Sequence, residues 1–169
     1  MPPRLRKVVL TIHVATTVGW LGAVLVFLVL ALIGLTSQQP ETVRAVLAVM
    51  EPTAWYVLVP LSVASLVVGV VQSLGTPWGL VRHWWVLFKL VITTLATIVL
   101  LSYMATFGDM TAVATDRTAS VGELRPFAGS VLLHASLALL GLLLTLVLSI
   151  YKPRAMTRYG QRKMARSNP

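Results

Sequence analysis

The sequence predicts an all-α integral membrane protein, a four-helix up-down bundle with a short external amphipathic helix between spans 1 and 2. Three observations predict this fold class: the chain has four long apolar runs, its five acidic residues all lie in two of the segments between those runs, and 57% of its residues are hydrophobic while 11% are charged. This composition differs strongly from that of a soluble domain. We therefore expect residues 1–169 to form a single membrane domain.

The four apolar runs have the length of membrane-spanning helices. Each is at least as long as the roughly 20 residues that cross a hydrocarbon core of about 30 Å. Apart from tyrosines near their ends, their ionisable side chains are His13, Lys89 and His134. The first run has 28 residues, about twice the apolar length of a signal peptide, so we expect it to stay uncleaved. The predicted spans are residues 8–35, 53–74, 84–107 and 127–151.

The segment between the first two runs has the pattern of an amphipathic helix. Its apolar residues follow the spacing i, i+3, i+4, i+7 at Val43, Val46, Leu47 and Met50. Pro40 suits a helix start, and we expect Pro52 to stop the helix. We expect this helix to lie on the outer interface or to fold over the mouth of the bundle.

Two further segments carry weaker signals. Pro60 removes one backbone donor from the second span and is expected to kink it. Residues 108–126 are polar and show no periodic pattern, so we expect a mobile external loop there.

The charge distribution predicts the orientation in the membrane, because cytoplasmic segments retain Lys and Arg. The two acidic segments, residues 36–52 and 108–126, hold only three of the fourteen Lys and Arg, and the other eleven, with Lys89 included, lie elsewhere. We therefore expect a plasma-membrane protein with both termini in the cytoplasm. Aromatic residues fall at both expected interfaces, namely Trp55, Tyr56, Tyr103, Phe107 and Phe127 outside and Trp78, Trp84, Trp85 and Tyr151 inside.

Residues 152–169 form a basic tail with six Lys and Arg and no acid. Beside an anionic leaflet, each such side chain contributes on the order of 1 kcal/mol of attraction. We therefore interpret the pI of about 10.9 as a sign of contact with the lipid bilayer and its anionic lipids, and we expect no nucleic-acid partner.

Polar side chains inside a membrane are the first candidates for function. His13, Gln72 and Lys89 lie at similar depths near the inner ends of the first three spans, whereas His134 lies nearer the outer end of the fourth. Trp20 follows His13 by seven residues and shares its helical face.

Each of these side chains has a structural and a functional interpretation. Either histidine is a buried, hydrogen-bonded imidazole or a ligand of haem or a metal. Lys89 either extends its ammonium to the headgroups or pairs with a propionate or another anion. Trp20 either fills the bundle or lines a cofactor site. The chain has no cysteine, which excludes disulfides and thiolate ligands, and no Walker loop, H-E-x-x-H motif or Ser-His-Asp set supports an enzyme class.

Short motifs carry a family resemblance over nearly the whole chain. His13 with the Gly19-Trp20-Leu21-Gly22 sequence, the run from Trp84 to Lys89, and the Tyr151-Lys152-Pro153-Arg154 exit resemble the copper-resistance-D-like superfamily, closest to its group of predicted membrane proteins of unknown function. The haem-containing oxidase branch implies a haem b near His13, Trp84 and Lys89. The copper branch implies copper passage, with soft ligands available at Met50, Met104 and Met110.

Three functions remain open on this evidence. The first is a membrane protein that binds haem b or a metal through His13 or His134, assisted by Lys89. The second is a non-catalytic scaffold or partner subunit without a cofactor, which associates with another membrane protein or with copies of itself. The third is a copper transport or resistance protein.

Overall fold

The computed structural model describes residues 1–76, 79–153 and 155–167, so Trp78 and Arg154 lie outside the described residues. Its named elements are all helical: α1 (Pro3–Thr36), α2 (Pro40–Thr53), the π-helical turn η1 (Ala54–Leu58), α3 (Val59–Leu74), α4 (Trp84–Thr115), α5 (Val121–Tyr151) and α6 (Arg158–Ser167). The predicted all-helical class is therefore confirmed.

Four stretches are long and apolar enough to cross a membrane: Pro3–Thr36, Pro40–Leu74, Trp84–Thr115 and Val121–Tyr151. Many large apolar side chains on these helices point outward, among them Val18, Val29, Leu95 and Leu140. Such a surface is costly in water and suits contact with lipid. The prediction of a multi-pass membrane protein is thus supported by both helix length and the apolar exterior.

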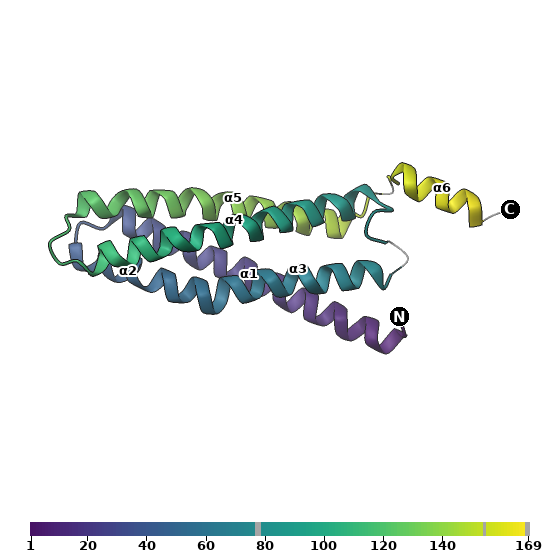
Figure 1. Ribbon diagram of the computed structural model, residues 1–169, viewed down its shortest axis with the longest axis horizontal. Coiled ribbons are helices and arrows are strands. Elements are labelled where there is room, and N and C mark those ends of the chain that lie inside the picture. The colour runs from purple at the N-terminus through teal and green to yellow at the C-terminus, as the bar shows by residue number, and fades with distance from the viewer. Residues whose placement is uncertain (77–78, 154, 168–169) are drawn as a thin grey trace.

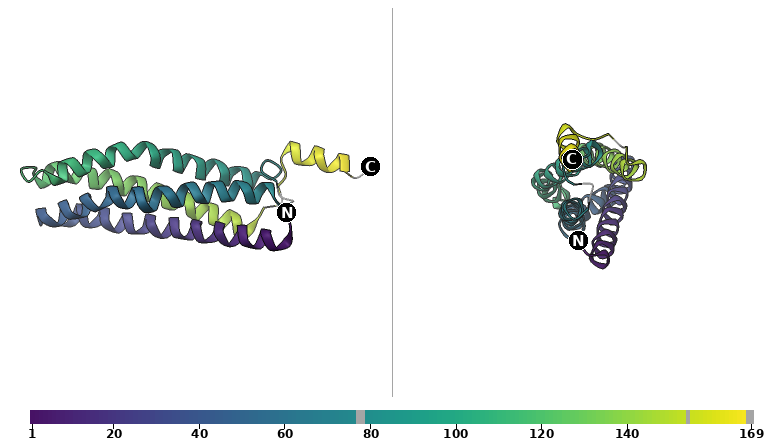
Figure 2. Two further views of the ribbon diagram at one scale, coloured as in Figure 1. Left: turned by 60° about the horizontal axis from the view of Figure 1, so that its bottom comes forward. Right: turned by 90° about the vertical axis from the view of Figure 1, so that its right-hand side faces the viewer.

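The long helices lie side by side along the longest axis of the molecule (Figure 1). Helix α1 packs against α3 and α5, and α4 packs against the same two helices, so the four enclose a common interior (Figure 2). Both termini and the connection between α3 and α4 lie at one end of the bundle (Figure 1). We call this the terminal end and the opposite one the distal end.

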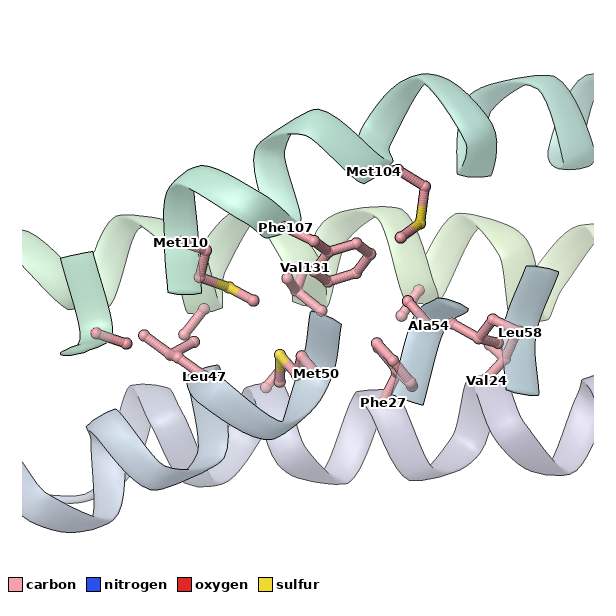
Figure 3. Packing of buried hydrophobic residues seen from close by; sticks show 14 of the residues in the cluster. Val24, Phe27, Leu47, Met50, Ala54, Leu58, Met104, Phe107, Met110 and Val131 are labelled. Atoms are coloured by element: carbon pink, nitrogen blue, oxygen red, sulfur yellow. The ribbon is translucent and has the colours of Figure 1, made fainter. Parts of the chain in front are cut away.

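Helix α2 occupies the distal end, where it packs against α1, α4 and α5. Its residues Val43, Leu47 and Met50 are each 0% exposed, which follows from the apolar spacing of the segment. Across from them, the rings of Phe27 and Phe107 meet edge to face with centroids 5.7 Å apart. In Figure 3 the side chains of Leu47, Met50, Phe27 and Phe107 point into the space between their helices, and all four belong to the hydrophobic core.

The helix that begins at Pro40 does not end at Pro52 as expected, because the helical path continues through η1 into α3. Proline removes a backbone donor from a helix. A π turn absorbs such a gap with an i to i−5 bond, and here the Val59 N–H donates to the carbonyl of Ala54. A π turn thus lies just before Pro60, the kink expected at Pro60 stays a prediction, and α2, η1 and α3 form one continuous helical path.

The expectation of an irregular loop over residues 108–126 was wrong. Helix α4 runs to Thr115 and α5 begins at Val121, so only residues 116–120 connect them. Ser120 and Glu123 form a capping box, in which the Ser120 N–H donates to Glu123 Oε2 over 2.8 Å. The Arg44 guanidinium also donates to the carbonyls of Arg117 and Ala119. This connection is short and tied to α2.

The tail is attached to the connection between α3 and α4. The Thr157 N–H donates to the carbonyl of Arg82 over 2.9 Å, and the Thr157 hydroxyl donates to the carbonyl of Val81 over 2.6 Å. His83 and Met156 form an antiparallel bridge. The first residues of the predicted basic tail are therefore bonded to the connection between α3 and α4 at the terminal end of the bundle, and α6 extends from there (Figure 1).

Candidate functional site

Three of the predicted site residues meet in one cavity. His13 on α1, Gln72 on α3 and Lys89 on α4 all line a space of about 100 Å³ near the terminal end of the bundle. Its wall also includes Ser65, Gly69, Ser73, Thr76, Trp85 and Thr93. We call this space the Lys89 cavity. It has room for several water molecules or a small anion.

A glycine on α3 sets the position of the His13 ring. A Cβ atom added at Gly69 would lie 3.1 Å from His13 Cε1, so only glycine lets the imidazole pack this closely on the helix. One turn along, the hydroxyls of Thr17 and Ser65 share a hydrogen bond of 2.9 Å. Helices α1 and α3 are thus joined directly above the imidazole.

Two polar atoms in the wall of the Lys89 cavity lack partners. His13 Nδ1 and Gln72 Oε1 are both buried and make no hydrogen bond within residues 1–76, 79–153 and 155–167. Burying a polar atom without a hydrogen bond costs roughly 1–3 kcal/mol. Native proteins rarely accept this cost without a bound water, ion or ligand. The cavity therefore has unused hydrogen-bonding capacity on two of its three walls.

The third wall supplies a positive charge. Lys89 Nζ donates to Ser149 Oγ over 2.6 Å, and Ser149 Oγ donates in turn to the carbonyl of Thr145 over 2.7 Å. The ammonium also lies 5.8 Å from the centre of the Trp85 ring, within reach of a cation–π contact. One of the three ammonium protons is used by Ser149, so the others can face a ligand.

No side-chain carboxylate balances this charge. The acidic residues are Glu41, Glu51, Asp109, Asp116 and Glu123, and all of them belong to the distal end. On the same helix, Asp109 is twenty residues from Lys89, a distance of about 30 Å. The Lys89 cavity is therefore a positively charged site.

His134 and Trp20 lie elsewhere. Both line a second, larger space of about 310 Å³ between α4 and α5, which shares no lining residue with the Lys89 cavity. His134 Nδ1 bonds to the carbonyl of Ser130 over 2.8 Å, and its ring lies 4.5 Å from that of Tyr103. The structure thus places the two predicted histidines against different cavities.

Trp84 also lies away from the Lys89 cavity. Its side chain is 45% exposed and packs beside Phe88 with ring centroids 6.0 Å apart, whereas its neighbour Trp85 lines the cavity. The sequence carried a signal for the further lining residues on α3 and just beyond its end at Leu74. Gly69, Gln72, Ser73 and Thr76 follow the spacing i, i+3, i+4, i+7 and so make one small and polar stripe.

The methionines considered as copper ligands belong to the hydrophobic core. Met50, Met104 and Met110 are all buried in the cluster around Phe27 and Phe107 (Figure 3). Within the described part of the chain, no three His, Cys, Asp or Glu residues come together as a group that could hold a metal ion. The arrangement of these methionines is that of packing residues.

No protein family model, no curated protein and no solved structure matches this chain. The resemblance to the copper-resistance-D-like superfamily therefore stays a prediction, and the function has to be argued from the cavities themselves.

Proposed function

We propose that this chain is a plasma-membrane protein that binds an anionic group in the Lys89 cavity. The observation that carries the proposal is the combination of one half-buried ammonium, the unpaired Nδ1 of His13 and the lack of a side-chain carboxylate around the same space. In this function Lys89 neutralises the charge of the ligand. Gln72 would fix its orientation by donating from its amide nitrogen, and His13 by donating from a protonated Nδ1.

The energetic argument favours a ligand over an empty cavity. An ammonium taken out of water costs several kcal/mol unless an opposite charge or a set of hydrogen bonds replaces the solvent. The single contact with Ser149 replaces only part of that hydration. A carboxylate or phosphate oxygen beside Lys89 would complete the ammonium's hydrogen bonds, and the Nδ1–H tautomer of a neutral His13 would donate to the same anion.

The size of the space limits the ligand. A volume of about 100 Å³ is well below the roughly 300–1,000 Å³ of pockets that hold drug-sized molecules. A small anion, or the carboxylate end of a larger molecule that extends past the cavity, suits this volume. The ligand class is therefore a small carboxylate or phosphate, or a cofactor that presents one.

In the proposed membrane placement the four long helices form an up-down bundle with the terminal end in the cytoplasm. The charge bias supports this orientation, because the terminal end holds most of the Lys and Arg and no acid. Helix α4 has 32 residues and is about 48 Å long, longer than the hydrocarbon core of about 30 Å. The distal end with α2 then projects outside the membrane as an external extension.

Basic residues at the start of the tail would meet anionic lipids of the inner leaflet in this placement. Arg158 and Arg162 on α6 are exposed, and the attachment of Thr157 to Arg82 holds the beginning of this helix at the terminal end of the bundle. A partner subunit or a second copy of the chain remains a further proposal, which would make the protein a scaffold.

Haem b is the second candidate. It is favoured by the pairing of Lys89 with His13 in one cavity, because a propionate suits Lys89 and an imidazole suits iron. The macrocycle does not fit into a space of about 100 Å³, so only a propionate would enter without rearrangement of α1 and α3. The visible spectrum of purified protein with iron and copper analysis tests this candidate: a Soret band with stoichiometric iron supports it, and a colourless, metal-free sample contradicts it.

The main proposal is tested by the thermal stability of detergent-purified protein in chloride, acetate and phosphate at constant ionic strength. We expect at least one anion to raise the unfolding temperature of the wild type. The Lys89→Met variant should lose this response, whereas Lys89→Arg should keep part of it because its charge remains. Equal responses of the wild type and Lys89→Met to every anion would contradict the proposal.

A further inference from the structure

A second site, independent of the Lys89 cavity, lies between α4 and α5. It is a crevice of about 310 Å³, a volume within the range of ligand pockets. Leu95, Val99 and Leu137 line its mouth and are about half exposed on the surface that suits lipid. Trp20 on α1 lines it deep in the bundle and is 2% exposed. The crevice thus leads from the bilayer into the protein interior.

Aromatic rings make up much of its inner wall. Phe27, Tyr103 and Phe107 line the crevice together with Trp20. Phe107 meets Phe27 edge to face at 5.7 Å and Tyr103 edge to face at 5.1 Å. Aromatic faces and edges of this kind prefer to pack against another flat ring. An aromatic ligand therefore suits the inner part of the crevice better than a flexible chain does.

The polar groups of the wall present lone pairs. A carbonyl oxygen can only accept, so the 2.8 Å bond between His134 Nδ1 and the Ser130 carbonyl places the proton on Nδ1. In the neutral imidazole, His134 Nε2 is then an acceptor. The Tyr103 hydroxyl donates its proton to Ser130 Oγ over 2.7 Å, which leaves lone pairs on the phenolic oxygen. Both groups favour a ligand that donates a hydrogen bond.

We propose that the crevice binds an isoprenoid quinol, with its ring against Trp20 and Phe107, a ring hydroxyl donating to His134 Nε2, and its tail leaving between Leu95 and Leu137 into the bilayer. The lipid phase supplies this ligand directly through the exposed mouth. A saturated acyl chain would fill the apolar mouth but leave Nε2 and the Tyr103 oxygen without a donor. The oxidised quinone would set carbonyl lone pairs against the lone pairs of the wall.

The proposal predicts selectivity for the reduced form. The quinol makes one hydrogen bond to the wall that the quinone does not make. Such a bond contributes about 1 kcal/mol to the binding free energy, which corresponds to about a fivefold difference in Kd. The probes are the decyl-tailed dimethoxy-methyl-benzoquinol and the matching quinone, titrated under nitrogen into the full-length protein in detergent. The readout is tryptophan fluorescence, with the Trp20→Phe variant subtracted to isolate the signal of Trp20. We expect the quinol to bind about fivefold more tightly than the quinone.

Matched variants locate the site. His134→Phe should abolish the preference for quinol, and Leu133→Ala, which alters an exposed residue beside the crevice that does not line it, should keep it. Ala138→Phe fills the crevice and should prevent binding of both forms, which tests the location even where His134→Phe fails to fold. Equal affinity for the two forms in the wild type, unchanged preference in His134→Phe, unchanged binding in Ala138→Phe, or equally strong competition by farnesol would each overturn the proposal.

Discussion

Lys89 differs from most lysines of membrane helices in where its ammonium lies. The contact with Ser149 at 2.6 Å and the neighbouring Trp85 ring hold the charge over a cavity, whereas extension to the headgroups is the usual way to lower the cost of a lysine in a helix. A membrane protein bears the free-energy cost of holding an ammonium inside the bundle where a ligand or a function offsets it. His13 and Gln72 each have an unpaired buried atom in the lining of this cavity, which supports that interpretation.

Replacement of Lys89 should therefore separate stability from binding. Methionine has a similar volume and no charge, so Lys89→Met should raise the unfolding free energy in anion-free detergent, by about 1 kcal/mol or more, while it abolishes stabilisation by anions. Thermal unfolding followed by circular dichroism measures both effects. Ser149→Ala serves as the control, because it removes the contact of the ammonium and keeps its charge. A loss of stability in Lys89→Met would show that the lysine has a structural role instead.

At the scale of elements, the contact between α1 and α3 depends on one glycine. A methyl group at Gly69 would lie 3.1 Å from His13 Cε1, whereas one at Gly22 on α1 would meet nothing within 4 Å. Overpacking of a tight contact costs about 1–3 kcal/mol. Gly69→Ala should therefore destabilise the protein and weaken its response to anions, and Gly22→Ala should change neither. Thermal unfolding of the two variants side by side decides this, and equal behaviour would contradict the proposed contact.

The capping box of α5 makes a second prediction at this scale. Ser120 and Glu123 satisfy backbone donors at the start of the helix, and loss of such a cap costs about 1 kcal/mol. Ser120→Ala should lower the unfolding free energy by about that amount, and Ser120→Asp should retain most of it because aspartate also caps helices. Denaturant unfolding of the three proteins measures the difference, and an unchanged Ser120→Ala variant would argue against the cap.

The connection between α4 and α5 should respond to acid. The hydroxyl and the backbone N–H of Thr118 both donate to the Asp116 carboxylate and hold the pKa of Asp116 below its ordinary value of 3.8. A carboxyl whose pKa is lower in the folded than in the unfolded protein stabilises the fold at pH values above its unfolded pKa. This stabilisation is lost as the pH falls through its folded pKa. Hydrogen-exchange protection of the Thr118 amide should therefore fall below pH 3.8 in the wild type but not in Asp116→Asn. Constant protection in both proteins would contradict this account.

At the scale of the whole molecule, the proposed orientation has a clean test because the chain has no cysteine. Arg117 lies in the distal connection and Gln161 on α6, and both are exposed. In intact cells, a membrane-impermeant maleimide should label Arg117→Cys and leave Gln161→Cys unlabelled until the membrane is opened. The reverse pattern would show that the termini lie outside the cell.

The general plan of the molecule could be predicted from the sequence, because helix length and apolar composition are properties of the chain itself. The similar depths of His13, Gln72 and Lys89 in the bundle could be predicted from the rise of about 1.5 Å per residue. In the structure the three side chains line one cavity, as their similar depths allow. The direction in which each side chain points could not be predicted from the sequence. Trp85 and not Trp84 lines the cavity, since that depends on how α4 is rotated against its neighbours.

The distal end was harder to predict for a different reason. The sequence predicted an irregular loop where α4 and α5 extend, because one proline and many polar residues obscure a helical pattern. Phe107, Met110 and Ala114 are buried at the spacing i, i+3, i+7. Helix α4 packs on α2 here, and Figure 3 shows Phe107 and Met110 turned toward that helix. Tertiary packing overrides weak local propensity there, as it also does at Pro52.

Binding of an anionic group in the Lys89 cavity can be measured by native mass spectrometry of the protein purified in mild detergent. The spectrum should show a bound anionic species on the wild type, at up to one equivalent, that is absent from Lys89→Met and present on Lys89→Arg and Leu133→Ala. The same bound species on the wild type and on Lys89→Met, or none on any variant after incubation with acetate and phosphate, would contradict the claim.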